Sequence, residues 1–456
     1  MEKNENIEII TGDPKKAINK LSIPIIASML LIFANNIIDS IWIAGLGADP
    51  LAAVGYITPL FMVLLGIGNG IGAGGNSLIS RYIGAEDKAS ANNAAIHNLI
   101  LGIIISVICT VVLLIFLEPL LNIMGASGVM SYARDYGIIL FLFAFTMLLP
   151  PILGGAFRSE GDITKATVPL ALSAIINICI DPVLIYILNL GISGAAWATV
   201  IANLISLLLM FYWIFIKKDG FLIYSKENFH NKVSMYKDIL VVGIPASLEQ
   251  LILSVLTIII NLMLTLTGGT VAVAVYTAGW RVINLGMLPA MGVGTSAISV
   301  AGVAFGAKKY ENIRTTARYS IKIGLIASVI ICILIFVFSN QIALIFSYSD
   351  TSAELAPLIV TFLQIMNLFI LVAPLGMTAS SVFQGVGKGT TSFLLTTFRE
   401  FVLVLSCAYI LGFVFNMGEI GIYYGMILGA GIGSLICYGV IELYVSKLIK
   451  GSENAV

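Results

Sequence analysis

The chain has 456 residues, of which 59% are hydrophobic and only 11% are charged, and its formal net charge is zero. A soluble domain carries roughly 25% charged residues, so this composition excludes a soluble protein and predicts an all-α polytopic membrane protein. The balanced charge gives no indication of a nucleic-acid partner.

Apolar runs that are long enough to cross a bilayer follow one another along the whole chain, separated by glycine, proline and clusters of charge. Such a run forms one membrane-spanning helix of about 20 residues or more, so the sequence predicts twelve transmembrane helices. The runs fall near residues 17–44, 51–83, 92–117, 129–156, 164–188, 192–216, 236–266, 271–304, 313–338, 354–384, 390–414 and 420–446.

Lysine and arginine are concentrated in the two tails and in every second loop. Basic loops remain on the cytoplasmic side of a membrane, so this alternation predicts that both termini are cytoplasmic and that the number of spans is even. The other loops, which contain no basic residue, lie around Asp49, Glu118, Asn189, Gly268, Asp350 and Glu419. Arg134, Arg281 and Arg399 fall outside the pattern.

The second half of the chain repeats the first. Gly70, Gly72, Gly84 and Ala85 recur 222 positions later as Gly292, Gly294, Gly306 and Ala307. With six spans in each half, we expect two lobes related by a pseudo-twofold axis along the membrane normal, as in many secondary transporters. The expected parts are a cytoplasmic tail (1–17), an N-lobe (18–216), a cytoplasmic linker (217–237), a C-lobe (238–448) and a second tail (449–456).

Asp39 places a carboxylate near the end of the first apolar run. An ionised side chain at membrane depth costs roughly 2.5 to 3.5 kcal/mol on insertion scales, so it is usually kept because it has a function. The alternative is that Asp39 reaches the outer surface or caps its helix. The repeat does not copy this residue, because the matching position in the seventh run is Ile260.

The fifth and sixth runs supply possible partners for Asp39. Asn177 and Asp181 are four residues apart and share one helix face, and Pro182 frees the carbonyl near Ile178. Thr199 lies in the sixth run, and at about 1.5 Å per residue Asp39, Asp181 and Thr199 all lie roughly 8 to 11 Å below the outer rim.

This group of side chains has two chemical interpretations. Carboxylate, amide and hydroxyl oxygens suit a small hard cation such as Na⁺, so Asp39, Asn177, Asp181 and Thr199 are candidate metal ligands. Alternatively, two acids in a dry pocket cannot both ionise easily, so one holds a proton. Either interpretation gives an ion-coupling site; a polar network that only locks helices together is the structural alternative.

The second half offers a less coherent set of polar residues. Glu249 in the seventh run is near mid-membrane, and either Arg281 or Arg399 could neutralise it; a structural pairing and a substrate role are both open. Gln364 and Asn367 add polar lining in the tenth run. We expect both histidines, His97 and His230, to be solvated or interfacial.

No pattern in the chain indicates an enzyme. The glycines between Gly66 and Gly75 formally match a dinucleotide loop, but they follow no strand and suit close helix packing instead. The five cysteines lie in apolar runs and are expected to be small core residues. We therefore expect no catalytic residue and no cofactor.

At this point the sequence resembles the multidrug and toxic compound extrusion (MATE) family, over almost the whole chain from Ile18 to Leu448. The matching motifs are Pro24 with Asp39 and Gly45-Leu46-Gly47, Gly84-Ala85, Phe157-Arg158-Ser159-Glu160-Gly161-Asp162, Asn177 with Asp181-Pro182, and Gly191 to Thr199. The resemblance implies twelve helices in two six-helix lobes. It also places the family's N-lobe cation or proton site on Asp39, Asn177, Asp181 and Thr199, and an acid of some branches on Glu249.

The resemblance further implies an antiporter that exports cationic or amphipathic organic compounds in exchange for H⁺ or Na⁺. A branch that uses a cation site in the C-lobe has a second acid in the tenth helix, and Phe362 to Gln384 contains none. We expect a monomer in the cytoplasmic membrane. A flippase for lipid-linked saccharides is the alternative function, followed by a receptor or channel.

Overall fold

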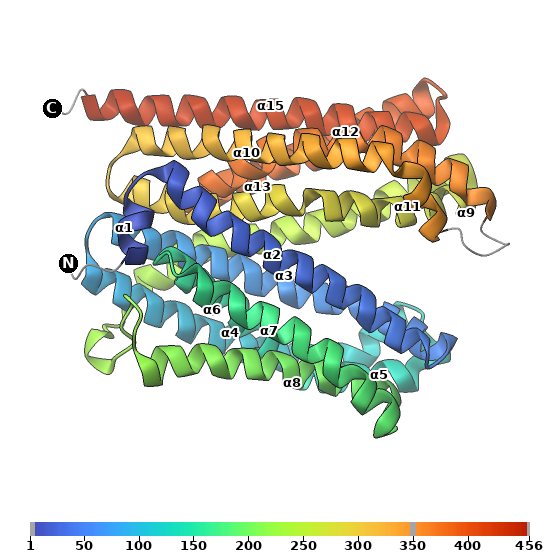
Figure 1. Ribbon diagram of the computed structural model, residues 1–456, viewed down its shortest axis with the longest axis horizontal. Coiled ribbons are helices and arrows are strands. Elements are labelled where there is room, and N and C mark those ends of the chain that lie inside the picture. Colours follow the sequence, from blue (N-terminus) through green and yellow to red (C-terminus); the bar gives the residue numbers. More distant parts are fainter. Residues whose placement is uncertain (1–4, 347–352, 454–456) are drawn as a thin grey trace. The chain divides into compact units, whose positions relative to one another are not determined.

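The protein is all helix in the part of the chain that the computed structural model describes, residues 5–346 and 353–453 (Figure 1). The long helices are α2 (Pro14–Ala44), α3 (Ala48–Gly84), α4 (Lys88–Ile123), α5 (Met130–Leu142), α6 (Phe145–Ser159), α7 (Ile163–Pro182), α8 (Gly191–Phe211), α9 (Val233–Gly306), α10 (Tyr310–Val337), α12 (Ala356–Gly385), α13 (Gly389–Thr397) and α15 (Gly418–Glu453). The loop around Asp350 and the outermost residues of both tails lie outside the described residues.

Shorter segments complete the chain. They are the helices α1 (Glu5–Thr11), α11 (Ser339–Phe346) and α14 (Leu405–Tyr409), the 3₁₀ turns η1 (Ala126–Val129), η4 (Lys226–Asn228) and η5 (Ala353–Leu355), and the π-helical segments η2 (Val183–Ile187), η3 (Tyr212–Lys217), η6 (Phe398–Val404) and η7 (Ile410–Val414).

The membrane spans agree with the predicted number. Ten helical stretches of the described chain are long and apolar enough to cross a membrane. One of them, α9, has 74 residues, and Gly269 with φ 65° divides it into two spans. The helices α5 and α6 together form a further span that is bent by 43°. Counting α9 twice and the bent pair once confirms twelve transmembrane helices in two sets of six.

The bend between α5 and α6 was not predicted. Pro150 and Pro151 lie inside α6 and have no backbone N–H, so the carbonyls of Thr146 and Met147 have no partner four residues on. The interruption at Phe143 and Ala144 comes about one turn before these two carbonyls.

The two halves repeat each other down to single hydrogen bonds. Asn189 has φ 54° and Asn416 has φ 53°, both unusual for a residue other than glycine. The backbone N–H of Leu190 donates to Leu184 O (3.1 Å), and that of Met417 donates to Leu411 O (3.2 Å). These are equivalent positions, so the internal repeat predicted from glycines extends to the backbone of the fifth and sixth spans.

Glycine allows the sixth span to approach the fifth in each half. A Cβ atom on Gly194 would lie 2.7 Å from Leu184 O, and one on Gly421 would lie 2.5 Å from Leu411 O. Both distances are too short for a side chain. Similarly, a Cβ atom on Gly72 would lie 2.5 Å from Pro151 O, so the glycine-rich stretch packs α3 against α6.

The chain divides into two compact units. Unit 1 comprises Met1–Gly12 and Ile23–Ser247, and unit 2 comprises Asp13–Ser22 and Leu248–Val456. Each has its own apolar core, which includes Phe141 in unit 1 and Phe362 in unit 2. The division differs from the predicted lobes because the start of α2 groups with the second half and residues 217–237 group with the first.

Residues 217–237, which we expected to be a simple polar linker, are bound to unit 1. The N–H of Leu222 donates to Glu160 Oε2 (2.9 Å), and the N–H of Lys232 donates to His97 Nε2 (3.1 Å). His97 is completely buried, so the expectation that it is solvated is wrong, whereas His230 is exposed. The linker covers His97, and sequence periodicity could not show that contact.

Glu160 gives this attachment a pH dependence. Burial raises the pKa of its carboxyl group from the ordinary value of 4.5 to about 7, although the Leu222 N–H opposes this shift. A carboxyl group whose pKa is raised by folding makes its full contribution to the stability of the folded state below pH 4.5, and this contribution is lost as the pH rises through about 7. The shift in pKa corresponds to a change of about 3 kcal/mol in the free energy of unfolding.

We therefore expect the melting temperature of the wild type to fall, relative to that of Glu160→Gln, between pH 4.5 and pH 7.5. Glutamine stays neutral and pays no cost of burying a charge. Thermal unfolding of the purified chain in detergent across this range measures the effect. Glu227→Gln, an exposed position in the same linker, is the matched control. Parallel pH profiles for wild type and Glu160→Gln would contradict the prediction.

Candidate functional site

The two acids that the depth argument placed together do meet in unit 1. Asp39 lies five residues before the end of α2, and Asp181 lies in the last turn of α7. Their carboxyl groups are within hydrogen-bond distance of each other. Asp181 is completely buried and Asp39 is half-buried. Two carboxylates this close repel unless a proton or a cation lies between them.

Asn177 holds Asp181 from the preceding turn of α7. Its Nδ2 donates to Asp181 Oδ1 at 3.2 Å, and its side chain is buried. A hydrogen bond from an amide orients the carboxylate and leaves the amide oxygen of Asn177 free to accept another donor or a cation. The predicted pair on one helix face is therefore in contact.

Thr199 is placed at the same level by the packing of α7 against α8. Ser173 lies one turn before Asn177 in α7, and Asn203 lies one turn after Thr199 in α8. The Ser173 Oγ donates to Asn203 Oδ1 at 2.9 Å. Because the helices are antiparallel, Asn177 and Thr199 are both one turn further toward the predicted outer side. The Thr199 hydroxyl donates to Ala195 O (3.1 Å), so its oxygen keeps lone pairs that can accept.

Tyr136 is a member of this site that the sequence reasoning missed. It lies in α5, its side chain is buried, and its phenol group is close enough to interact electrostatically with both Asp39 and Asp181. The signal was available, because Tyr136 is seven residues into its span and so at the depth of the two acids. It was overlooked because Tyr136 follows the charged pair Arg134-Asp135.

Several oxygens of the site have no hydrogen-bond donor among the residues that the structure describes. They are Asp39 Oδ1, Asp181 Oδ2 and, one turn before Asp39 on the same helix, Asn35 Oδ1. Buried oxygens without donors cost free energy, typically about 1 to 3 kcal/mol for each. A bound proton or small cation removes this cost, so the geometry favours cation chemistry at this place.

The chain changes its helical geometry immediately after Asp181. Pro182 has no N–H to donate to the carbonyl of Ile178, and the π-helical segment η2 begins at Val183. Tyr186 in η2 donates its hydroxyl to Trp42 O, and the two rings are 6.2 Å apart. The end of α2 that carries Asp39 is thereby fixed next to α7.

The equivalent positions of unit 2 are apolar. The two halves can be aligned by pairing Asn189 with Asn416, and this alignment pairs the polar residues of α7 and α8 with apolar ones. For α2, the alignment that pairs Ile23 with Ile244 also pairs Asp39 with Ile260. The apolar counterparts of Asp39, Asn177, Asp181 and Thr199 are Ile260, Val404, Ala408 and Met426, all buried in one core cluster. The fold therefore does not need polar side chains at these places.

In unit 2, Glu249 lies among hydroxyl and amide groups rather than against an arginine. Its carboxylate accepts from Ser392 Oγ (2.7 Å), Ser380 Oγ (3.2 Å) and Gln384 Nε2 (3.3 Å). Ser380 also contacts Ser392. The serines are small residues in apolar runs, and for that reason the sequence did not draw attention to them.

The other candidates of the second half are dispersed. Arg399 is buried and its Nε pairs with Glu400 Oε1 (2.9 Å). Asn367 donates to Cys332 O (2.6 Å) and so ties α12 to α10. Arg281 and Gln364 are exposed, and neither has a hydrogen bond or ion pair with any described residue. The structure brings none of these four into hydrogen-bond contact with Glu249.

Carboxylates and imidazoles do not gather into a larger metal site. Within residues 5–346 and 353–453, no group of three or more His, Cys, Asp or Glu side chains could share a metal ion. The five cysteines are free thiols, but only Cys332 and Cys437 are buried and Cys179 is exposed, so the expectation that all five are core residues is wrong. Any cation at Asp39 and Asp181 would therefore need the amide and hydroxyl oxygens as further ligands.

Comparison with known proteins gives the same family from sequence and from structure. The MatE family model matches residues 24–183 and 245–410. The multidrug export protein MepA of Staphylococcus haemolyticus (strain JCSC1435) is 27% identical over 391 residues, which cover 85% of each chain. MepA of Staphylococcus aureus (strain MRSA252) is 24% identical over 443 residues, covering 97% of this chain and 96% of its own.

Solved structures are similar over the whole chain. The outward-facing conformation of a multidrug resistance MATE family transporter of the MOP superfamily has 35% identity and a TM-score of 0.96, covering 99% of this chain and 100% of its own. A MOP superfamily transporter from Pyrococcus furiosus Vc1 (DSM3638), described with a binding pocket of reverse polarity, has 35% identity and a TM-score of 0.95, covering 98% and 99%.

Proposed function

Because the chain belongs to the MatE family, and is therefore a transporter and not an enzyme, we propose that it is a secondary active antiporter for multidrug efflux. It exports cationic or amphipathic organic compounds in exchange for H⁺ or Na⁺. The similarity to the multidrug export protein MepA supports the export of multiple drugs. We further propose that it acts as a monomer in the cell membrane, with both termini in the cytoplasm.

The observation that carries the coupling proposal is the contact between Asp39 and Asp181. Two acids share one buried site in unit 1, and the equivalent positions in unit 2 are filled by apolar side chains. Packing therefore does not account for them. A proton or Na⁺ bound by Asp39 and Asp181, with Asn177 and Thr199 as further ligands, neutralises the pair.

Such an ion drives transport only if it binds one conformation more tightly than another. The site is well placed for this, because Asp39 and Asp181 belong to different helices, α2 and α7. A movement of α2 relative to α7 changes the distance between the two carboxylates. Occupancy by the ion thus favours the arrangement in which the acids are close.

For unit 2 we propose a different task. Glu249 is the acid there that interacts with a cationic substrate, because its partners are neutral hydroxyl and amide groups that can rearrange. Arg399 acts on Glu249 only through the electric field, since its own hydrogen bond goes to Glu400. Asn367 has a structural contact instead.

Efflux from proteoliposomes with a pH gradient and a Na⁺ gradient imposed separately tests the function. We expect one of the two gradients to accelerate the exchange of a dye such as ethidium, and Asp39→Asn to remove the acceleration. Empty liposomes under the same gradients are the control. Ion flux without any substrate exchange would contradict an antiporter and indicate a channel.

A further inference from the structure

Two helices of unit 2 carry an exposed apolar face that changes to basic residues near one end, and the start of α2 in the same unit adds two more basic residues. The faces contain Ile326 in α10 and Leu443 in α15, which are 52% and 66% exposed. The basic residues, here called the basic rim, are Lys16, Lys20, Arg318, Lys322, Lys447 and Lys450, all of them exposed.

The rim residues of α10 and α15 continue the apolar face of their own helix. Lys322 and Arg318 precede Ile326 by four and eight residues. Lys447 and Lys450 follow Leu443 by four and seven. Residues at these spacings lie on one side of a helix, so each apolar face ends in two positive charges.

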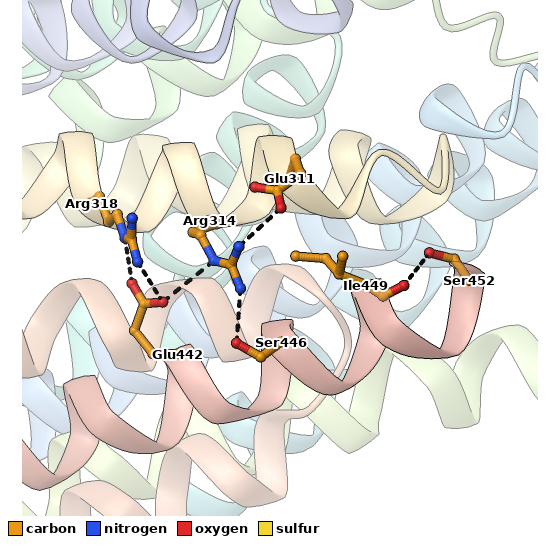
Figure 2. A network of polar contacts seen from close by, with 7 residues as sticks. All are labelled: Glu311, Arg314, Arg318, Glu442, Ser446, Ile449 and Ser452. Atoms are coloured by element: carbon orange, nitrogen blue, oxygen red, sulfur yellow. Dashed lines mark hydrogen bonds and ion pairs between the residues drawn. The ribbon is translucent and has the colours of Figure 1, made fainter. Parts of the chain in front are cut away.

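The start of α2, α10 and α15 are neighbours within unit 2. Asn19 Nδ2 of α2 donates to the Tyr319 hydroxyl of α10 (2.9 Å), and the Nζ atom of Lys15 is 6.0 Å from the centre of the Tyr319 ring. The next residue, Arg318, joins α10 to α15, because its Nε and Nη2 donate to Glu442 at 2.7 and 3.0 Å (Figure 2). Tyrosine prefers the membrane interface, so Tyr319 marks the headgroup level.

The two acids next to Arg314 and Arg318 are already paired with these arginines. Glu442 forms ion pairs with Arg318 and with Arg314 (3.4 Å), and Glu311 forms an ion pair with Arg314 (2.9 Å), as Figure 2 shows. Four of the rim residues, Lys16, Lys322, Lys447 and Lys450, have no hydrogen bond or ion pair with any described residue. Their charge is available to an external anion.

Unit 1 pairs part of its basic loop residues with acids. Lys165 pairs with Asp162 (3.0 Å) and with Asp219 (2.7 Å), and Lys217 also pairs with Asp219 (2.7 Å). Cytoplasmic orientation requires basic loops in both halves. This orientation does not require that unpaired lysines lie at the end of an exposed apolar helix face. The position of the basic rim therefore needs another explanation.

We propose that the basic rim binds the phosphate headgroups of anionic phospholipids, whose acyl chains lie along the exposed apolar faces of α10 and α15. Clusters of four to eight lysines or arginines beside membrane spans attract anionic lipids. The ammonium groups reach the phosphate while their stems cover apolar surface. Soluble phosphate offers the same charge, but only a lipid also covers the apolar faces.

Spin-labelled lipid in vesicles tests this directly. The full chain is reconstituted in phosphatidylcholine with a minor fraction of phosphatidylglycerol, and electron paramagnetic resonance measures how much labelled phosphatidylglycerol is immobilised relative to labelled phosphatidylcholine. We expect a preference for phosphatidylglycerol in the wild type. The variant K16Q/K322Q/K447Q/K450Q should lose it, by about fivefold for each lysine removed.

The matched control is K218Q/K226Q/K232Q/K237Q, which removes the same charge from exposed positions of unit 1 and should keep the preference. Arginine at the four rim positions should also keep it, which separates charge from folding defects. Equal preference in wild type and rim variant, or equal loss in the control, overturns the proposal. So does displacement of the labelled lipid by excess inorganic phosphate, which would indicate a general anion site.

Discussion

Replacing Asp39 by asparagine is expected to reduce efflux of ethidium from loaded cells to the level of cells that lack the protein. Asparagine has nearly the same shape but can neither take up a proton nor hold Na⁺ by charge. Coupling between ion and substrate is typically worth 1 to 3 kcal/mol, or about 5- to 150-fold, and all of it is lost with the charge. Dye efflux measured by fluorescence, with the amount of protein in the membrane determined in parallel, checks the result.

Asp49→Asn is the control for this experiment. Asp49 is exposed in the first turn of α3 and undergoes the same chemical change only a few residues from Asp39 in the sequence. We expect it to transport normally. Unimpaired efflux by Asp39→Asn would show that the carboxylate is dispensable and would remove the basis of the proposed coupling site.

The double variant Asp39→Ile/Asp181→Ala is expected to fold normally and to transport nothing. It gives unit 1 the residues that unit 2 has at the equivalent positions, Ile260 and Ala408, which are both buried in an apolar core. Burying acidic groups costs free energy, so replacing both acids by apolar groups should leave the stability unchanged or raise it. Melting temperature and dye efflux of the same preparation measure the two effects.

The single variant Asp181→Ala sharpens this test. It leaves Asp39 as a lone acid beside the new apolar side chain, and a polar or charged group without a partner is costly to bury, whereas the double variant buries neither acid. We therefore expect the single variant to melt below the double variant. If the double variant fails to fold, the two acids serve to lock helices together, which is the structural alternative to an ion site.

The helices were largely predictable because membrane spans are long apolar runs that depend little on tertiary contacts. The run 163–187 of the structure, for instance, was expected at 164–188. Features created by backbone geometry were not predictable in this way. The π-helical segments η2 and η7 and the interruption before α6 arise from hydrogen-bond patterns that hydropathy does not show.

The candidate site was predictable to the extent that charge and depth decide it. A carboxylate inside a membrane span is rare and expensive, so Asp39 and Asp181 stood out, and their common depth suggested the contact. Tyr136 and the serines around Glu249 did not stand out, because uncharged side chains of these types are common in membrane helices. Their role depends on which helices are neighbours, and only the structure supplies that.

The π-helical turn after the fifth span separates what the backbone decides from what the side chains decide. Segments η2 and η7 occupy equivalent positions, although proline precedes only the first, at Pro182. Both halves share this geometry, down to the left-handed Asn189 and Asn416. Asp39 and Asp181 belong to only one of the halves. The same backbone can thus carry either an acidic pair or an apolar core at these positions, and a proline is not needed to form the turn.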